Sequence, residues 1–194
     1  MNAAEVVRAQ PGRGGPNRVR IIGGAWRSRV LRFPARPGLR PTPGRVRETL
    51  FNWLGQDLSG WRCLDLFAGS GALGFEAASR GAAEVVLVER DARALAALRR
   101  NAEALGAQQV RIVPADALAF LHSAPGRFDL ILLDPPYDSA LLAPALAAAG
   151  RCLQPHGKIY VEARVVPDLS AWRVLRQGRA GESQHWLLEA LPPT

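Results

Sequence analysis

Asp134, Pro135, Pro136 and Tyr137 form a short motif with the groups needed to act on an amine. The motif directly follows the apolar stretch 129–133, which predicts a buried strand, and in open α/β sheets ligands bind beyond the carboxyl ends of the strands. The Asp134 carboxylate and the Pro135 carbonyl can accept the two N–H bonds of a planar amine, while consecutive prolines hold these acceptors rigidly. Tyr137 can stack on the ring that carries the amine. The motif therefore predicts methylation of an amine on an aromatic base.

A glycine-rich turn after the apolar stretch 63–67 predicts a nucleotide-cofactor site. Gly69, Gly71 and Gly74 have the spacing of dinucleotide-binding turns, and Glu89 lies twenty positions beyond Gly69. Glycine suits such a turn because the backbone must bend sharply and let a ligand approach without a Cβ atom in the way. This spacing alone leaves a dinucleotide-dependent oxidoreductase open.

Asp65, which precedes the glycine turn, favours a cationic cofactor. A carboxylate there would repel a pyrophosphate, whereas S-adenosylmethionine has no phosphate and carries an ammonium and a sulfonium. Glu89 can then accept hydrogen bonds from the ribose hydroxyls. Asp116 either accepts one from the adenine amino group or caps the helix that follows it. The predicted cofactor-binding residues are Asp65, Phe67, Gly69, Ser70, Gly71, Glu89, Arg90, Asp116 and Ala117.

The remaining composition argues against metal or covalent catalysis. Cys63 and Cys152 lie in apolar contexts typical of buried thiols, and the three histidines are scattered along the chain. No apolar run in the sequence approaches the ~18 residues of a membrane span, and the first ten residues lack the apolar stretch of a secretory signal. We therefore expect a cytoplasmic protein with no metal and no membrane contact.

Positive charge is concentrated at the N-terminus. Residues 1–60 hold 11 arginines against three acidic residues, whereas residues 61–194 hold 14 basic and 14 acidic residues, so the whole net charge of +8 arises in the first part. A one-sided basic segment is typical of a protein that binds phosphates. It predicts a nucleic-acid partner and leaves a non-catalytic RNA-binding module open.

The N-terminal part divides into a tail and an extension. Residues 1–18 contain almost no large apolar side chain, which predicts a disordered basic tail. Residues 19–60 are expected to form an extension with a hairpin and then a helix capped near Thr42, in which Arg45 and Arg47 fall largely off the apolar stripe.

Residues 61–194 alternate between short apolar strands and amphipathic helices. Such alternation predicts one α/β domain with a parallel, doubly wound sheet and helices on both of its faces. Two apolar runs near the C-terminus predict a closing antiparallel hairpin. The expected strands are 63–67, 84–88, 109–113, 128–133 and 158–162, and the hairpin runs are 171–176 and 184–188.

Four segments together resemble a known family, the bacterial 16S rRNA guanine methyltransferases of the RsmD type. The segments are 20–27 (RIIGGAWR), 39–52 (LRPTPGRVRETLFN), 64–71 (LDLFAGSG) and 134–137 (DPPY). The first two separate this family from other enzymes with the same catalytic loop, and the resemblance covers residues 20 to 189.

The resemblance implies a Rossmann-like class I methyltransferase fold with a seven-stranded mixed sheet. We also expect a monomer. The resemblance further implies transfer of a methyl group from S-adenosyl-L-methionine to the N2 amine of guanine 966 in 16S rRNA, within an assembling 30S particle. The extension would help to hold the RNA, with Trp26 as a stacking surface or a core residue. Candidate RNA contacts are Arg27, Arg29, Arg40, Arg45 and Arg47. An amine methyltransferase acting on DNA or on a protein glutamine is the alternative within the same class.

Overall fold

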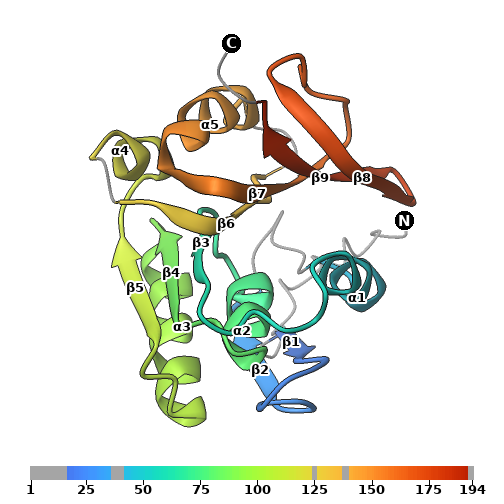
Figure 1. Cartoon of the computed structure of the whole chain (residues 1–194). Helices are drawn as coiled ribbons and strands as arrows, with labels where there is room; N and C mark the ends of the chain where they lie inside the picture. The colour runs from blue at the N-terminus through green and yellow to red at the C-terminus, as the bar shows by residue number, and fades with distance from the viewer. Residues whose placement is uncertain (1–16, 36–41, 124–125, 137–139, 192–194) are drawn as a thin grey trace, which may run out of the picture.

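The computed structural model describes residues 17–35, 42–123, 126–136 and 140–191, which contain a seven-stranded sheet and a separate two-stranded sheet (Figure 1). In the large sheet, five parallel strands are followed by two antiparallel ones. In spatial order the strands are β5 (Val110–Pro114), β4 (Glu84–Glu89), β3 (Arg62–Asp65), β6 (Phe128–Leu133), β7 (Leu153–Ala163), β9 (Ser183–Ala190) and β8 (Trp172–Ala180). The predicted mixed, doubly wound sheet is therefore confirmed.

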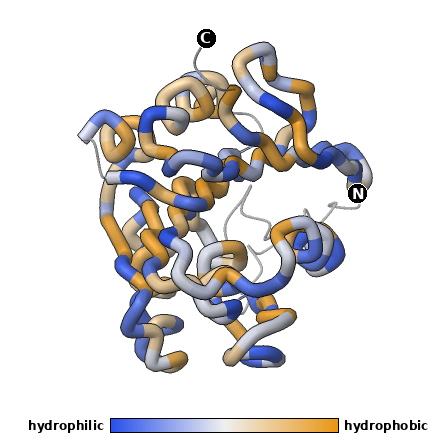
Figure 2. Tube along the Cα trace, viewed as in Figure 1, coloured by the Kyte–Doolittle hydropathy of each residue, from blue (hydrophilic) through white to orange (hydrophobic). Residues whose placement is uncertain are grey.

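Alternate residues of the central strands enter two separate hydrophobic cores, one on each face of the sheet. On one face, Cys63 and Leu132 pack with α1 (Gly44–Trp53), α2 (Ala72–Ser79) and α3 (Ala92–Leu105). On the other, Leu64 and Ile131 pack with α4 (Ala117–His122), α5 (Leu142–Ala149) and the 3₁₀ turn η1 (Gly150–Cys152). Strands buried on both faces must be apolar throughout, which explains the mostly hydrophobic trace of β4 (Figure 2). Both cysteines are free and buried, as expected.

β7 is longer than the sequence pattern predicts. It begins at Leu153, five residues before the expected start, although Pro155 and Gly157 interrupt the apolar run. The strand continues because the pairing register with β6 shifts between Phe128 and Leu130, so the interruption is accommodated as an irregularity beside β6. The β8–β9 hairpin is likewise longer than predicted.

The N-terminal extension is attached to α2 through buried polar groups. Strands β1 (Asn17–Arg20) and β2 (Val30–Phe33) pair with each other, and the loop between them packs on the C-terminal end of α2. The Glu76 carboxylate accepts hydrogen bonds from the backbone N–H groups of Ile22 and Gly23, both at 2.8 Å. A Cβ atom at Gly24, where φ is +75°, would lie 1.8 Å from the carbonyl oxygen of Ser79. Gly24 is therefore required by close backbone packing on α2, whereas a Cβ atom at Gly23 would lie 2.5 Å from the Arg80 guanidinium.

Arg47 is not on the surface, contrary to the interpretation of α1 from its apolar stripe. Arg47 is only 2% exposed, and its guanidinium donates to Glu76 at 3.1 Å and to the Arg20 carbonyl at 3.0 Å. Arg80 donates to the same Glu76 carboxylate. Two buried arginines share one buried carboxylate, so Arg47 joins α1 to α2 and we withdraw it as a candidate phosphate contact.

Candidate active site

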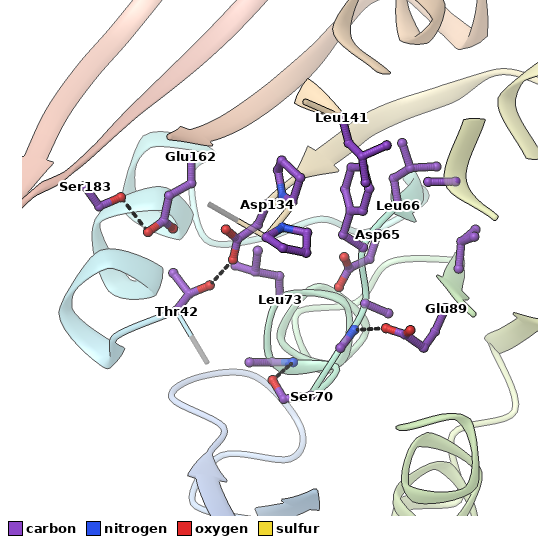
Figure 3. Close-up of a pocket in the computed structure, with 18 of the residues that line it drawn as sticks. Thr42, Asp65, Leu66, Ser70, Leu73, Glu89, Asp134, Leu141, Glu162 and Ser183 are labelled. Carbon is purple, nitrogen blue, oxygen red and sulfur yellow. Dashed lines mark hydrogen bonds between the residues drawn. The ribbon is translucent and has the colours of Figure 1, made fainter. Parts of the chain in front are cut away.

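One cavity of about 670 Å³ lies beyond the carboxyl ends of β3, β4, β6 and β7 and brings the two predicted motifs together. β3 and β6 are neighbours in the sheet. After β3 the chain continues to β4 on one side, and after β6 it continues to β7 on the other side. This is the switch point at which ligands bind in open α/β sheets. Asp65 is the last residue of β3 and Asp134 directly follows β6, and both line the cavity (Figure 3).

Asp65 is a buried carboxylate in the floor of the cavity. It is 2% exposed, and its Oδ2 accepts a hydrogen bond from the Gly74 N–H at 3.0 Å, in the first turn of α2. Burial raises the pKa of Asp65 to about 7, and the nearby Glu89 charge adds to the effect. A cation bound beside Asp65 would favour the ionised form, so the site fits the ammonium predicted from the sequence.

Glu89 is held at the end of β4 by three backbone N–H groups. Gly69 donates to its Oε2 at 2.9 Å, while Arg90 and Asp91 donate to its Oε1. These bonds join the glycine turn to the end of β4 and set the direction of the carboxylate. Asp116 is the N-cap of α4 through Leu118 and Ala119, which confirms its capping role; it also lines the cavity.

Most of the other predicted cofactor residues line the same cavity. They are Phe67, Gly69, Ser70, Arg90 and Ala117. Gly71 does not line it, but has φ +77° as the N-cap of α2 and so shapes the turn. The Rossmann-type turn thus forms as predicted, with an acidic group beneath it.

Asp134 is oriented by Thr42, a residue that the sequence interpretation treated as part of a helix cap. The N-cap of α1 is instead Pro43, and no side chain caps the helix. The Thr42 hydroxyl donates to Asp134 Oδ2 at 2.9 Å (Figure 3). Desolvation in the cavity raises the pKa of Asp134 well above its usual range, and the Glu162 charge raises it further. Pro135 and Pro136 line the cavity beside Asp134, whereas Tyr137 lies outside the described residues.

The candidate RNA-contacting residues differ in their exposure and in their distance along the chain from the cavity-lining residues. Arg45 is exposed in the first turn of α1, next to the cavity-lining residues Pro43 and Val46. Arg27 and Arg29 are exposed on the loop that packs against the C-terminal end of α2, and Arg29 donates to the Ala104 carbonyl in α3. Trp26 is partly buried against the core, and Arg40 lies outside the described residues.

Sequence reasoning missed five polar residues that line the cavity, namely Thr42, Glu162, Arg164, Glu182 and Ser183. Glu162 is 1% exposed near the end of β7, and Ser183 begins β9. Glu162 follows the buried stretch 159–161, so the rule that located Asp65 and Asp134 at strand ends would also have found it. Ser183 and Thr42 carry no such local signal.

Comparisons with known proteins agree with this geometry. Residues 19–189 match the family model described as Conserved hypothetical protein 95. The chain is 41% identical over 186 residues to Ribosomal RNA small subunit methyltransferase D of Escherichia coli, with 93% of this chain and 94% of that protein covered. A solved Escherichia coli structure, described as a candidate methyltransferase, superposes with a TM-score of 0.81 at 40% identity, covering 90% of this chain and 98% of the other.

A more distant structure supports the fold alone. The Thermus thermophilus 16S rRNA N2 G1207 methyltransferase, solved with AdoMet and guanosine, superposes with a TM-score of 0.70 at 23% identity over 91% of this chain and 50% of that one. Family match, close relatives, fold and cavity lead to one assignment. The chain belongs to the RsmD family and is a class I methyltransferase.

Proposed function

We propose that this enzyme transfers a methyl group from S-adenosyl-L-methionine to the N2 amine of guanine 966 in 16S rRNA, as a cytoplasmic monomer acting on an assembling small ribosomal subunit. The name of the Escherichia coli relative supports small-subunit rRNA as the substrate. The observation that carries the proposal is the convergence of Asp134 and Pro135 with Asp65 on one cavity. Amine acceptors therefore lie in the same cavity as a group suited to a cationic methyl donor.

The residues present fit S-adenosylmethionine. When bound, this cofactor supplies an electrophilic methyl group on a sulfonium. Asp65 would bind its ammonium, Glu89 its ribose hydroxyls, and Asp116 its adenine amino group with the oxygen that does not cap α4. The acidic floor also disfavours a dinucleotide, whose pyrophosphate would lie over Asp65.

Asp134 and Pro135 orient the reacting amine. An aromatic amine is a weak nucleophile because its lone pair is delocalised into the ring. When the Asp134 carboxylate and the Pro135 carbonyl accept its two N–H bonds, the nitrogen is held with its lone pair directed away from both acceptors. The Asp134 carboxylate can also accept the proton that the nitrogen must lose after methylation.

The test is methyl transfer from labelled cofactor to small-subunit particles that lack the modification. Asp134→Ala should lower the rate by a factor on the order of a thousand, while calorimetry detects unchanged cofactor affinity. Asp57→Ala is the matched control, because Asp57 is exposed in the turn between α1 and β3. DNA and protein acceptors are offered in competition. The proposal is wrong if RNA receives no label, or if another acceptor is preferred.

A further inference from the structure

Glu162 is a buried carboxylate beside the catalytic loop that the mechanism above does not use. Leu133 of β6 pairs with Val161 of β7, so Asp134 and Glu162 each follow that last registered pair. Neighbouring strands lie about 4.8 Å apart, and the two carboxyl groups lie near each other at the cavity (Figure 3). Because the two groups lie so near, the Glu162 charge also raises the pKa of Asp134.

Two hydroxyl groups hold the Glu162 carboxylate in place. Ser183 donates to Oε1 at 2.7 Å and Tyr160 donates to Oε2 at 3.1 Å. A buried carboxylate needs such partners, and each carboxylate oxygen can accept more than one hydrogen bond. The cavity thus presents two neighbouring carboxylates to whatever base enters it.

Two neighbouring carboxylates that both accept hydrogen bonds require a base edge with two neighbouring N–H donors, one of them on the reacting amine. Guanine carries the N1–H donor next to the N2 amine. Adenine and cytosine instead have an unprotonated ring nitrogen next to the amine, and a glutamine side chain has a carbonyl oxygen there. Each of these would direct a lone pair at the second carboxylate, which is repulsive and leaves the carboxylate unsatisfied.

We infer that Glu162 is the residue that selects guanine, by accepting the N1–H hydrogen bond while Asp134 accepts from the N2 amine. This inference rests on the proposed function, because it assigns the base that enters the same cavity. It also provides a physical reason why the alternative acceptors, a DNA adenine or cytosine and a protein glutamine, would be excluded.

The test replaces the target guanine by 2-aminopurine, which keeps the reacting amine but lacks both the N1–H donor and the O6 oxygen. Small-subunit particles are reconstituted with ligated 16S RNA that carries either base at the target position, and kcat/KM for methyl transfer is measured. The wild-type enzyme should prefer guanine by a factor on the order of 100, the loss expected when a charged acceptor is left without its donor. Glu162→Gln should reduce this preference to within about tenfold, since the amide can donate to the unprotonated N1.

Glu182→Gln is the matched control, because Glu182 also lines the cavity but its side chain is 84% exposed. It should keep the wild-type preference. Unchanged cofactor affinity and melting temperature establish that Glu162→Gln is folded, and equal use of both bases by the wild-type enzyme would overturn the inference even if that variant does not fold. The role of Glu162 is wrong if the wild-type enzyme uses both bases equally, or if folded Glu162→Gln keeps the preference for guanine. Either result leaves the proposed function standing. Absence of transfer to guanine by the wild-type enzyme overturns the proposed function and this inference together.

Discussion

Asp65 is suited to bind a cation, but burying its carboxylate lowers the stability of the folded protein. Burial raises the pKa of Asp65 to about 7, so without a bound cation this carboxyl group is partly protonated near neutral pH. Between the ordinary carboxyl pKa and about 7, the folded protein therefore binds a proton that the unfolded chain has released. Its free energy of unfolding must decrease as pH rises through that window, and a bound cation would offset the loss.

The affinity for S-adenosylmethionine should accordingly increase as pH rises from 5.5 to about 7, by up to about tenfold per unit, because the ionised Asp65 binds the ammonium. Calorimetry across this range measures the effect. Asp65→Asn should bind the cofactor more weakly and with little dependence on pH. In urea denaturation without ligand, the free energy of unfolding of the same variant should decrease less between pH 4 and 7 than that of the wild type. Equal pH dependence in both proteins would contradict the assignment.

Thr42 acts on the reaction through Asp134, so it is a positioning residue. Thr42→Val keeps the shape but removes the hydroxyl donor to Asp134 Oδ2, and kcat should fall on the order of tenfold. KM and cofactor affinity should change little. Thr42→Ser retains the donor and should restore most of kcat. A loss of melting temperature that accompanies the loss of kcat, without rescue by serine, would indicate a structural role instead.

The extension and the catalytic domain are joined by one buried charge cluster. Glu76 of α2 is fully buried and bonds to two backbone N–H groups of the β1–β2 loop and to the guanidinium groups of Arg47 and Arg80. Arg47 in turn donates to the Thr42 carbonyl at 3.2 Å. Contacts therefore run from α2 through α1 to Thr42, the residue that donates to Asp134.

Glu76→Gln should destabilise the protein by roughly 3–5 kcal/mol, because it leaves two buried arginines without their counter-charge. Urea denaturation gives the free energy of unfolding. Glu84→Gln is the matched control: Glu84 pairs with Arg62 and Arg111, but its side chain is 34% exposed, and the loss should stay below about 1 kcal/mol. If both variants lost a similar free energy of unfolding, burial of the Glu76 charge cluster would not be the cause of the effect.

Charge is distributed unevenly over the molecule, and the described arginines of the N-terminal part differ in what they contact. Arg47 is internal, Arg29 contacts α3, and Arg45 is exposed beside the cavity. Among these three, Arg45 is the best placed to bind a phosphate next to the target base. None of the helices in the described ranges is long and apolar enough to cross a membrane.

RNA affinity should fall steeply with salt if arginines neutralise phosphates. Arg45→Gln should make the slope of log K against log salt concentration shallower by about 0.7 to 0.9, the contribution of one phosphate contact. Arg151→Gln is the control, since Arg151 is exposed in η1, which precedes β7 at the opposite end of that strand from Glu162. Filter binding at several salt concentrations measures both slopes. Identical slopes for Arg45→Gln and the wild type would remove Arg45 from the interface.

The sequence was sufficient to predict the sheet, the cofactor turn and the catalytic loop because their signals are local. Parallel strands buried on both faces are continuous apolar runs, and Asp65, Glu89 and Asp134 stand at the ends of such runs. The tertiary structure decided what Thr42, Arg47 and Glu162 contact. Arg47 is internal because it meets Glu76, 29 residues away, and Thr42 reaches Asp134 across 92 residues. A pairing between distant segments leaves no periodic trace in either segment, so only the folded chain reveals it.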